Sequence, residues 1–120
     1  MEKRVKYAES FVKEASKILT RNFKSTDIDL KDSEVLKLLE KSGRKIEAHI
    51  IGSIFNRYPI DSIYAQRTGE IKKSSPYLWT INSLSFEESL NDSYIEISIK
   101  NLENSVEKTV KYFPFSKGLV

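Results

Sequence analysis

A loop rich in serine and glutamate carries three acidic side chains close together in the second half of the chain. Glu87, Glu88 and Asp92 fall within six residues, and carboxylate oxygens are the ligands that Mg²⁺ and Ca²⁺ prefer. With Asp61 or Glu70, they would form a cation site if the fold brought them together. A solvated acidic loop has the same composition, and this is the interpretation that we favour.

Histidine and cysteine offer little further chemistry. The sequence has no cysteine, which excludes disulfides, cysteine-ligated zinc, iron–sulfur clusters and thiol catalysis. Its one histidine, His49, lies between Ala48 and Ile50 in a helical pattern. A histidine can act as a general base near neutral pH. We favour the simpler interpretation of His49 as a surface or partly buried helix residue.

The basic side chains are concentrated in the first half of the chain. The 120 residues carry 20 Lys and Arg against 17 Asp and Glu, a net charge of +3. Residues 1–60 hold 13 basic and 9 acidic side chains, and residues 61–120 hold 7 and 8. A basic helix face is typical of proteins that bind nucleic-acid phosphates. The basic residues of the first helical segment are Lys3, Arg4, Lys6, Lys13, Lys17, Arg21 and Lys24.

Acidic residues interleave with this basic series and favour an ordinary exposed helix. Glu2, Glu9 and Glu14 alternate with the lysines, and Glu9 lies four residues before Lys13, a spacing that supports helix formation. A Lys-Lys pair at residues 72–73 could also touch phosphate, but no glycine-rich loop accompanies it. Nucleic-acid binding therefore stays an alternative.

Two amphipathic helices are predicted in the first half. Apolar residues recur at three- and four-residue steps over residues 2–23, with charged residues between them. A second helix starts at Ser33, a favourable N-cap, and ends at Pro59, which removes a backbone donor. Gly43 lowers helix stability by about 1 kcal/mol relative to Ala, so we expect a break or bend near it. Residues 27–31 alternate like an edge strand or form only a loop.

The second half has the two-residue period of β-strands. Residues 101–105 separate two strand-like runs and predict a hairpin loop between antiparallel neighbours. Trp79, Tyr77 and Tyr94 lie in such runs, and we interpret them as core or strand-face residues rather than a ligand-stacking platform. The strand-like runs are residues 60–65, 77–81, 94–100 and 106–113.

The predicted fold is α+β, with two N-terminal helices packed on one face of an antiparallel β-sheet. We expect a single domain over residues 1–120, helical over residues 1–58 and β-rich over residues 60–120. The N-terminus lacks the apolar core of a signal peptide, and no stretch approaches the ~20 apolar residues of a membrane span. We therefore expect a cytoplasmic protein that does not enter a membrane.

Five short strings follow one another in a fixed order. Residues 15–23, ASKILTRNF, and residues 46–59, IEAHIIGSIFNRYP, are helical strings. Residues 63–69, IYAQRTG, and residues 79–87, WTINSLSFE, stand where a related pattern would have I-L-G-E-E-x-G and W-x-I-D-P-L-D-G-T. Residues 95–100 contain the strand string ISI. In this order and spacing, the strings resemble the N-terminal half of the inositol monophosphatase family, the metal-dependent, lithium-sensitive sugar-phosphate phosphatases.

The resemblance implies a Mg²⁺-dependent phosphatase site, but the sequence departs from the family at the metal ligands. In place of the Glu-Glu pair it has Gln66 and Arg67, and an Arg guanidinium has no lone pair and repels Mg²⁺. In place of the two aspartates of the second motif it has Asn82 and Ser85, and Glu87 replaces the threonine. We therefore expect no catalytic residue, no metal ligand and no cofactor.

These departures predict a non-catalytic, truncated inositol monophosphatase-like protein that acts through protein–protein contacts. Family members are longer, so the resemblance implies that an apolar sheet face or an open strand edge stays uncovered here. We expect a homo-oligomer or a protein partner to cover it. Two alternatives stay open. The first is a Mg²⁺-dependent phosphatase of inositol or sugar phosphates, with a site rebuilt from Glu87, Glu88 and a partner chain. The second is a small basic nucleic-acid-binding protein.

Overall fold

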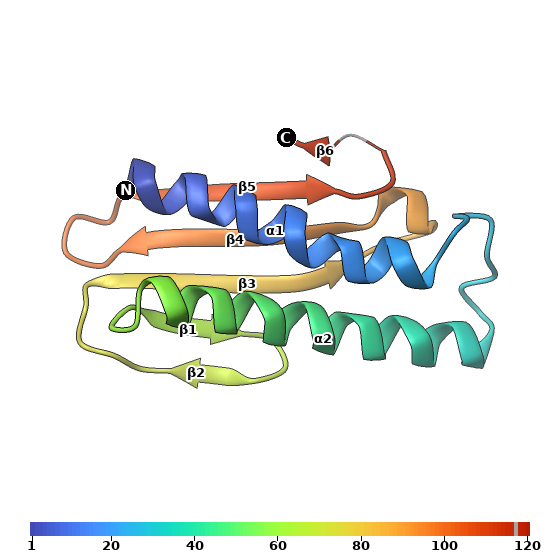
Figure 1. Ribbon diagram of the computed structural model, residues 1–120, viewed down its shortest axis with the longest axis horizontal. Coiled ribbons are helices and arrows are strands. Elements are labelled where there is room, and N and C mark those ends of the chain that lie inside the picture. The colour runs from blue at the N-terminus through green and yellow to red at the C-terminus, as the bar shows by residue number, and fades with distance from the viewer. Residues whose placement is uncertain (117) are drawn as a thin grey trace.

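Two long helices precede a sheet of six strands in the part of the chain that the computed structural model describes, residues 1–116 and 118–120. Both helices lie side by side on one face of the sheet, so the fold has two layers (Figure 1). The elements are α1 (Glu2–Asn22), α2 (Ser33–Arg57), β1 (Ser62–Ala65), β2 (Gly69–Ile71), β3 (Tyr77–Ser85), the 3₁₀ turn η1 (Leu90–Asp92), β4 (Tyr94–Asn101), β5 (Glu107–Phe113) and β6 (Gly118–Leu119).

The two helices form where the sequence predicts them, with two differences in detail. The side chain of Asp32, rather than that of Ser33, caps α2 by accepting a hydrogen bond from the Glu34 amide at 2.8 Å. The break expected near Gly43 is wrong, because α2 continues through it. Residues 27–31 belong to no strand, so the loop alternative is the correct one for this segment.

The sheet is mixed, which corrects the wholly antiparallel sheet expected from the sequence. Its strand order is β2-β1-β3-β4-β5-β6. β1 and β3 run parallel, with Ile63 opposite Trp79 and Ala65 opposite Ile81, whereas the other neighbours are antiparallel. The predicted hairpin between β4 and β5 is confirmed. The sequence pattern predicts neither of the short strands β2 and β6.

One hydrophobic core fills the space between the helices and the sheet. Every second residue of the central strands faces this core because side chains alternate along a strand. Small residues on α1, such as Ala8 and Ala15, let the helix approach the sheet closely. The largest fully buried side chains of the strands are Ile63, Trp79, Ile81, Ile95, Ile97 and Ile99.

The opposite face of the sheet is mainly polar. Thr80, Ser98 and Thr109 are register partners across β3, β4 and β5, and Ser98 Oγ lies 2.9 Å from Thr109 Oγ1. Beside this row, Lys111 Nζ lies 3.7 Å from Glu96 Oε2. The uncovered face is therefore not the apolar surface that the sequence analysis allowed for.

The open strand edges that the sequence analysis gave as its other expectation are present at both sides of the sheet, at β2 and at part of β5. Within the described residues, no strand pairs with the outer edge of β2. β6 covers only one end of β5, so its outer edge over residues 107–110 is also unpaired in that part of the chain.

No helix among the described residues combines the length and the apolar character that a membrane crossing requires.

Candidate functional site

The parallel pairing of β1 with β3 brings the two family-like motifs together. Ala65 and Ile81 are the last register partners of these strands, so the turn that follows β1 lies beside the continuing end of β3. Arg67 follows β1, and its Nη1 donates a hydrogen bond to Ser83 Oγ on β3. The carboxyl ends of adjacent parallel strands are a common place for ligand sites in sheets of this kind.

The Arg67 guanidinium occupies this position as an internal cation. Its Nε and Nη2 donate to the two carboxylate oxygens of Glu40 at 3.1 and 3.2 Å, a paired geometry. Its Nη1 also lies 3.8 Å from Glu47 Oε2. Only 25% of the Arg67 side chain is exposed to solvent. The junction of the two motifs therefore holds a fixed positive side chain paired with carboxylates.

Glu47 is a buried carboxylate at the centre of this network, with 2% of its side chain exposed. Its Oε1 accepts hydrogen bonds from the amide and the hydroxyl of Thr68 at 2.8 and 2.7 Å. Its Oε2 accepts from the Arg67 amide and from Ser83 Oγ, both at 3.3 Å. These four donors and the nearby guanidinium use the oxygens that a metal ion would otherwise coordinate.

Gly43 makes room for the guanidinium against α2. A Cβ atom at this position would lie 2.8 Å from Arg67 Nη2 and 3.0 Å from Arg67 Cζ, closer than van der Waals contact allows. The glycine in the middle of the helix therefore has a packing role. A hollow of 450 Å³ opens beside the network, lined by Glu40, Arg44, Glu47, Ala48, Arg67 and Thr68.

Arg67 also affects the acidity of Glu40. The hydrogen bonds from Arg67, assisted by one from Arg44 Nε at 3.2 Å, lower the pKa of Glu40 below its ordinary value of 4.5. About half of the Glu40 side chain is exposed, so water screens this ion pair and its effect on stability is small.

The second motif provides no carboxylate either. Asn82 Nδ2 donates to Ser85 Oγ at 2.7 Å, and Asn82 Oδ1 is buried with no hydrogen-bond partner among the described residues. Gln66 is exposed immediately before Arg67. One amide oxygen and several hydroxyls beside a guanidinium do not fit Mg²⁺, which binds to carboxylate oxygens in proteins and is repelled by a fixed cation.

The acidic loop does not assemble a metal site. Glu87 and Asp92 line a separate hollow of 430 Å³ together with Tyr94. Among residues 1–116 and 118–120, no group of three or more His, Asp or Glu side chains is placed to hold a metal ion. Asp61, which the sequence analysis grouped with this loop, is buried elsewhere, and Glu70 is an exposed residue of β2.

Asp61 belongs to a structural cluster that ties α1 to the sheet. Arg4 donates to both of its oxygens, at 2.8 and 3.1 Å, and Trp79 Nε1 donates to Oδ2 at 2.8 Å. The Arg4 guanidinium lies between two rings, 3.7 Å from the centroid of Tyr77 and 4.4 Å from that of Tyr58. Burial raises the pKa of Asp61, but the hydrogen bonds and the charge of Arg4 outweigh it and the pKa falls below 3.8.

The aromatic and histidine interpretations agree with the structure. Trp79 is fully buried, as a core residue should be. Tyr77 covers the Arg4 guanidinium, and Tyr94 packs against Phe113 with ring centroids 5.4 Å apart. His49 is exposed on α2.

Sequence reasoning missed the partners of Arg67, namely Glu40, Glu47 and Gly43. One signal was available: Glu47 is a charged residue directly beside Ile46 in the apolar stripe of α2. Such a position predicts a buried carboxylate, which requires hydrogen-bonded partners. No sequence signal linked Glu47 to Arg67, since 20 residues separate them.

Comparison with known proteins finds resemblance in three-dimensional structure only. No protein-family model matches the sequence, and no curated protein does. The solved inositol monophosphatase of Anabaena (Nostoc) sp. PCC 7120 matches 98% of this chain with a TM-score of 0.73 and 19% identity. Inositol monophosphatase II of Staphylococcus aureus MSSA476 matches 99% with a TM-score of 0.74 and 15% identity. The extragenic suppressor protein SuhB of Bartonella henselae matches 96% of this chain with a TM-score of 0.74 and 15% identity.

The matched region is 42% to 45% of the length of these three chains. At this level of identity the likeness establishes the fold, and it confirms the resemblance that the sequence strings indicate. The chain therefore has the fold of about half of an inositol monophosphatase.

Proposed function

We propose that this chain is a non-catalytic protein on a phosphatase-like half fold and that it acts through contacts with other protein chains. The observation that carries the proposal is the Arg67 guanidinium, which is bonded to Glu40 and Ser83 at the junction of the two motifs. A phosphatase of the related fold needs carboxylates there to hold divalent cations. Here the position is filled and its charge is already balanced.

A metal and phosphate assay tests the non-catalytic part of the proposal. We expect no phosphate release from inositol or sugar monophosphates in millimolar Mg²⁺, and no rise in melting temperature beyond that given by NaCl of equal ionic strength. A ligand that binds only the folded state must raise that temperature. A saturable rise with Mg²⁺, or phosphate release that EDTA abolishes, would overturn the proposal and favour the phosphatase alternative.

A variant with four restored carboxylates separates metal binding from turnover. Because it removes the guanidinium and adds acidic groups beside Glu47, we expect Mg²⁺ to raise its melting temperature. We expect no phosphate release, since the matched fold is less than half of the related enzymes. Turnover by this variant would contradict the proposal. The substitutions are Gln66→Glu, Arg67→Glu, Asn82→Asp and Ser85→Asp.

For the protein contacts, we propose self-association through the open strand edges. The outer edges of β2 and of residues 107–110 carry unpaired backbone donors and acceptors, which are templates for another strand. Sedimentation at several concentrations should give a mass that rises above 13.9 kDa. A mass of 13.9 kDa at every concentration would refute self-association.

A further inference from the structure

The helical layer carries more than the whole excess positive charge of the molecule. α1 has six basic and three acidic side chains, and α2 has five and three. The rest of the chain has nine basic and eleven acidic side chains. The helices therefore hold a net charge of +5 against −2 elsewhere. Since both helices lie on the same face of the sheet, this charge is presented on one side of the molecule (Figure 1).

On α1 the basic side chains form a stripe that points away from the core. At 100° per residue, Ala8, Val12 and Leu19 mark the buried side of the helix. The opposite side carries five basic residues between Lys3 and Arg21, a length of about 27 Å at 1.5 Å per residue. We name this set the α1 stripe; it consists of Lys3, Lys6, Lys13, Lys17 and Arg21.

The acidic residues of α1 lie along the margins of this stripe. Glu2 and Glu9 line a groove with Lys6, Val106 and Lys108, on the flank of α1 next to β5. On the other margin, Glu14 pairs with Lys17 at 3.1 Å. Part of the interleaving seen in the sequence therefore persists in space, beside Lys6 and Lys17.

Several cations on this side lack a countercharge. Within the described residues, the ion pairs of the outer helix surface use Lys17, Lys37 and Arg44. The basic side chains of the outer surface without an acidic partner there are Lys3, Lys6, Lys13, Arg21, Lys41 and Lys45. A dense set of unpaired like charges is unfavourable unless anions bind to it, so the surface fits a polyanion.

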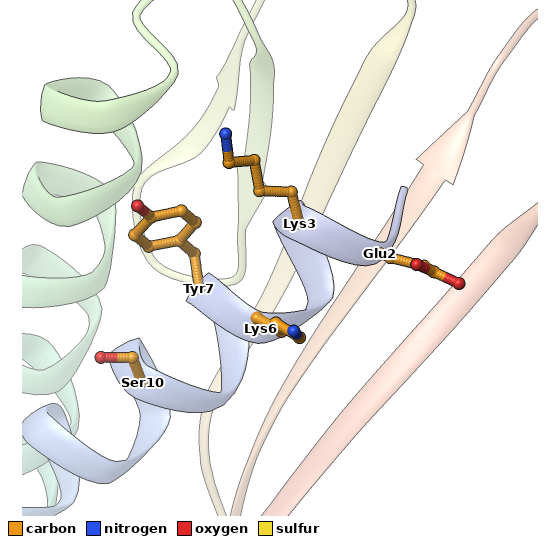
Figure 2. A pocket seen from close by; sticks show the side chains of 5 residues that line it. All are labelled: Glu2, Lys3, Lys6, Tyr7 and Ser10. Atoms are coloured by element: carbon orange, nitrogen blue, oxygen red, sulfur yellow. The ribbon is translucent and has the colours of Figure 1, made fainter.

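A hollow at the N-terminal end of α1 provides a defined contact point. It has a volume of 450 Å³ and is lined by Glu2, Lys3, Lys6, Tyr7 and Ser10. Figure 2 shows Tyr7 and Ser10 pointing toward α2 and Lys6 projecting in front of α1, away from the sheet. Arg57 of α2 lies over the Tyr7 ring at 4.4 Å, which adds a third cation to this end of the layer.

We propose that the outer face of the helical layer binds the phosphate backbone of a nucleic-acid duplex without reading its sequence. A duplex carries one charge per about 1.7 Å of its axis, so it offers many phosphates along the α1 stripe. A single strand would need exposed rings for stacking. On this side Arg57 lies over the Tyr7 ring, and Lys73 Nζ lies 4.7 Å from the centroid of Phe55, which is 46% exposed, so a cation already occupies one face of each ring. An anionic membrane is less suited, because the apolar side of α1 is buried in the core and cannot insert.

The test compares two variants of equal net charge by anisotropy of a short fluorescein-labelled DNA duplex. Each variant replaces three lysines by glutamine and so lowers the net charge from +3 to 0. The helix variant changes the helical layer and the control changes the loop before β3 and the polar sheet face. Circular dichroism and urea unfolding verify that both fold. The helix variant is Lys6→Gln, Lys13→Gln and Lys45→Gln, and the control is Lys72→Gln, Lys100→Gln and Lys111→Gln.

For the wild type, we expect log K to fall with log salt concentration with a slope of about −4 to −5, as for four to six phosphate contacts. The helix variant should lose about 3 from this slope and bind at least ~10-fold more weakly at about 50 mM salt. The control should change affinity by less than about threefold.

Three results would overturn the proposal. They are equal losses in the helix variant and the control, a wild-type slope near zero or absent binding, and tighter binding to phosphatidylserine vesicles than to the duplex. The proposal does not depend on the function proposed above, since the phosphatase and sedimentation assays measure neither salt dependence nor duplex binding.

Discussion

Gly43→Ala is expected to lack the gain in stability of about 1 kcal/mol that replacing a glycine inside a helix by alanine ordinarily brings. The added Cβ would lie 2.8 Å from Arg67 Nη2, so the end of the Arg67 side chain has to shift. This shift disturbs the paired bonds to Glu40 and the bond to Ser83.

The magnitude follows from these two opposed effects. The half-exposed ion pair with Glu40 contributes about 0.2–1 kcal/mol because water screens it, and the hydrogen bond to Ser83 contributes about 0.5–1.5 kcal/mol. Set against the gain of about 1 kcal/mol in helix propensity, their loss gives Gly43→Ala a net change between a gain of about 0.3 kcal/mol and a loss of about 1.5 kcal/mol in the free energy of unfolding. When Arg67 is already replaced by alanine, nothing has to move, and the same Gly43→Ala change should stabilise by about 1 kcal/mol.

Urea unfolding followed by circular dichroism measures all four proteins of this double-mutant cycle. Gly52 is a matched control in the same helix, because a Cβ there meets no atom within 4 Å. Gly52→Ala should stabilise by about 1 kcal/mol in both backgrounds. If Gly43→Ala behaves like Gly52→Ala and adds to Arg67→Ala within about 0.5 kcal/mol, the close packing of Gly43 and Arg67 is refuted.

Two further predictions concern the Asp61 cluster. Trp79→Ala should lower the free energy of unfolding by about 3–5 kcal/mol because the ring is fully buried. Trp79→Phe loses mainly the indole donor to Asp61 and should lower it by about 1–3 kcal/mol. A nearly unchanged free energy for the alanine variant in urea unfolding would contradict the first prediction. The pKa of Asp61 is lower in the folded protein than its ordinary 3.8, so its contribution to stability is complete above that pH and is lost as the pH falls below it. Asp61→Asn should reduce the loss of stability at acidic pH when the free energy of unfolding is measured as a function of pH. Glu40→Gln, at a half-exposed carboxylate, should change this pH dependence little. An unchanged pH dependence in Asp61→Asn would contradict the prediction.

Much of the fold is predictable from local pattern, because both helices and the four longer strands carry a clear period. The parallel pairing of β1 with β3 cannot be predicted in this way. It depends on the three-residue strand β2, which separates the two along the chain and lies on the other side of β1 in the sheet. Three residues are too few to show alternation. The wrong assignment of Gly43 has a different cause: its low propensity is real, but side-chain packing from another element decides what the position does.

The candidate site shows the same division between local and distant information. The replacement of carboxylates at Gln66, Arg67, Asn82 and Ser85 is visible in the sequence alone. The partner of Arg67 is not visible there, because its side chain pairs with Glu40, a carboxylate 27 residues away on another element. A change of charge in a motif can be read from the sequence, whereas the residue that balances this charge is known only from the fold.

The line of hydroxyls from Thr80 to Thr109 lets water wet the bare side of the sheet. Face-to-face stacking of two such molecules would strip that hydration and gain little hydrocarbon contact in return. A third layer could be designed onto this face only after apolar side chains had been substituted there. We therefore expect the sheet face to stay exposed to solvent, and copies at high concentration to associate through their strand edges.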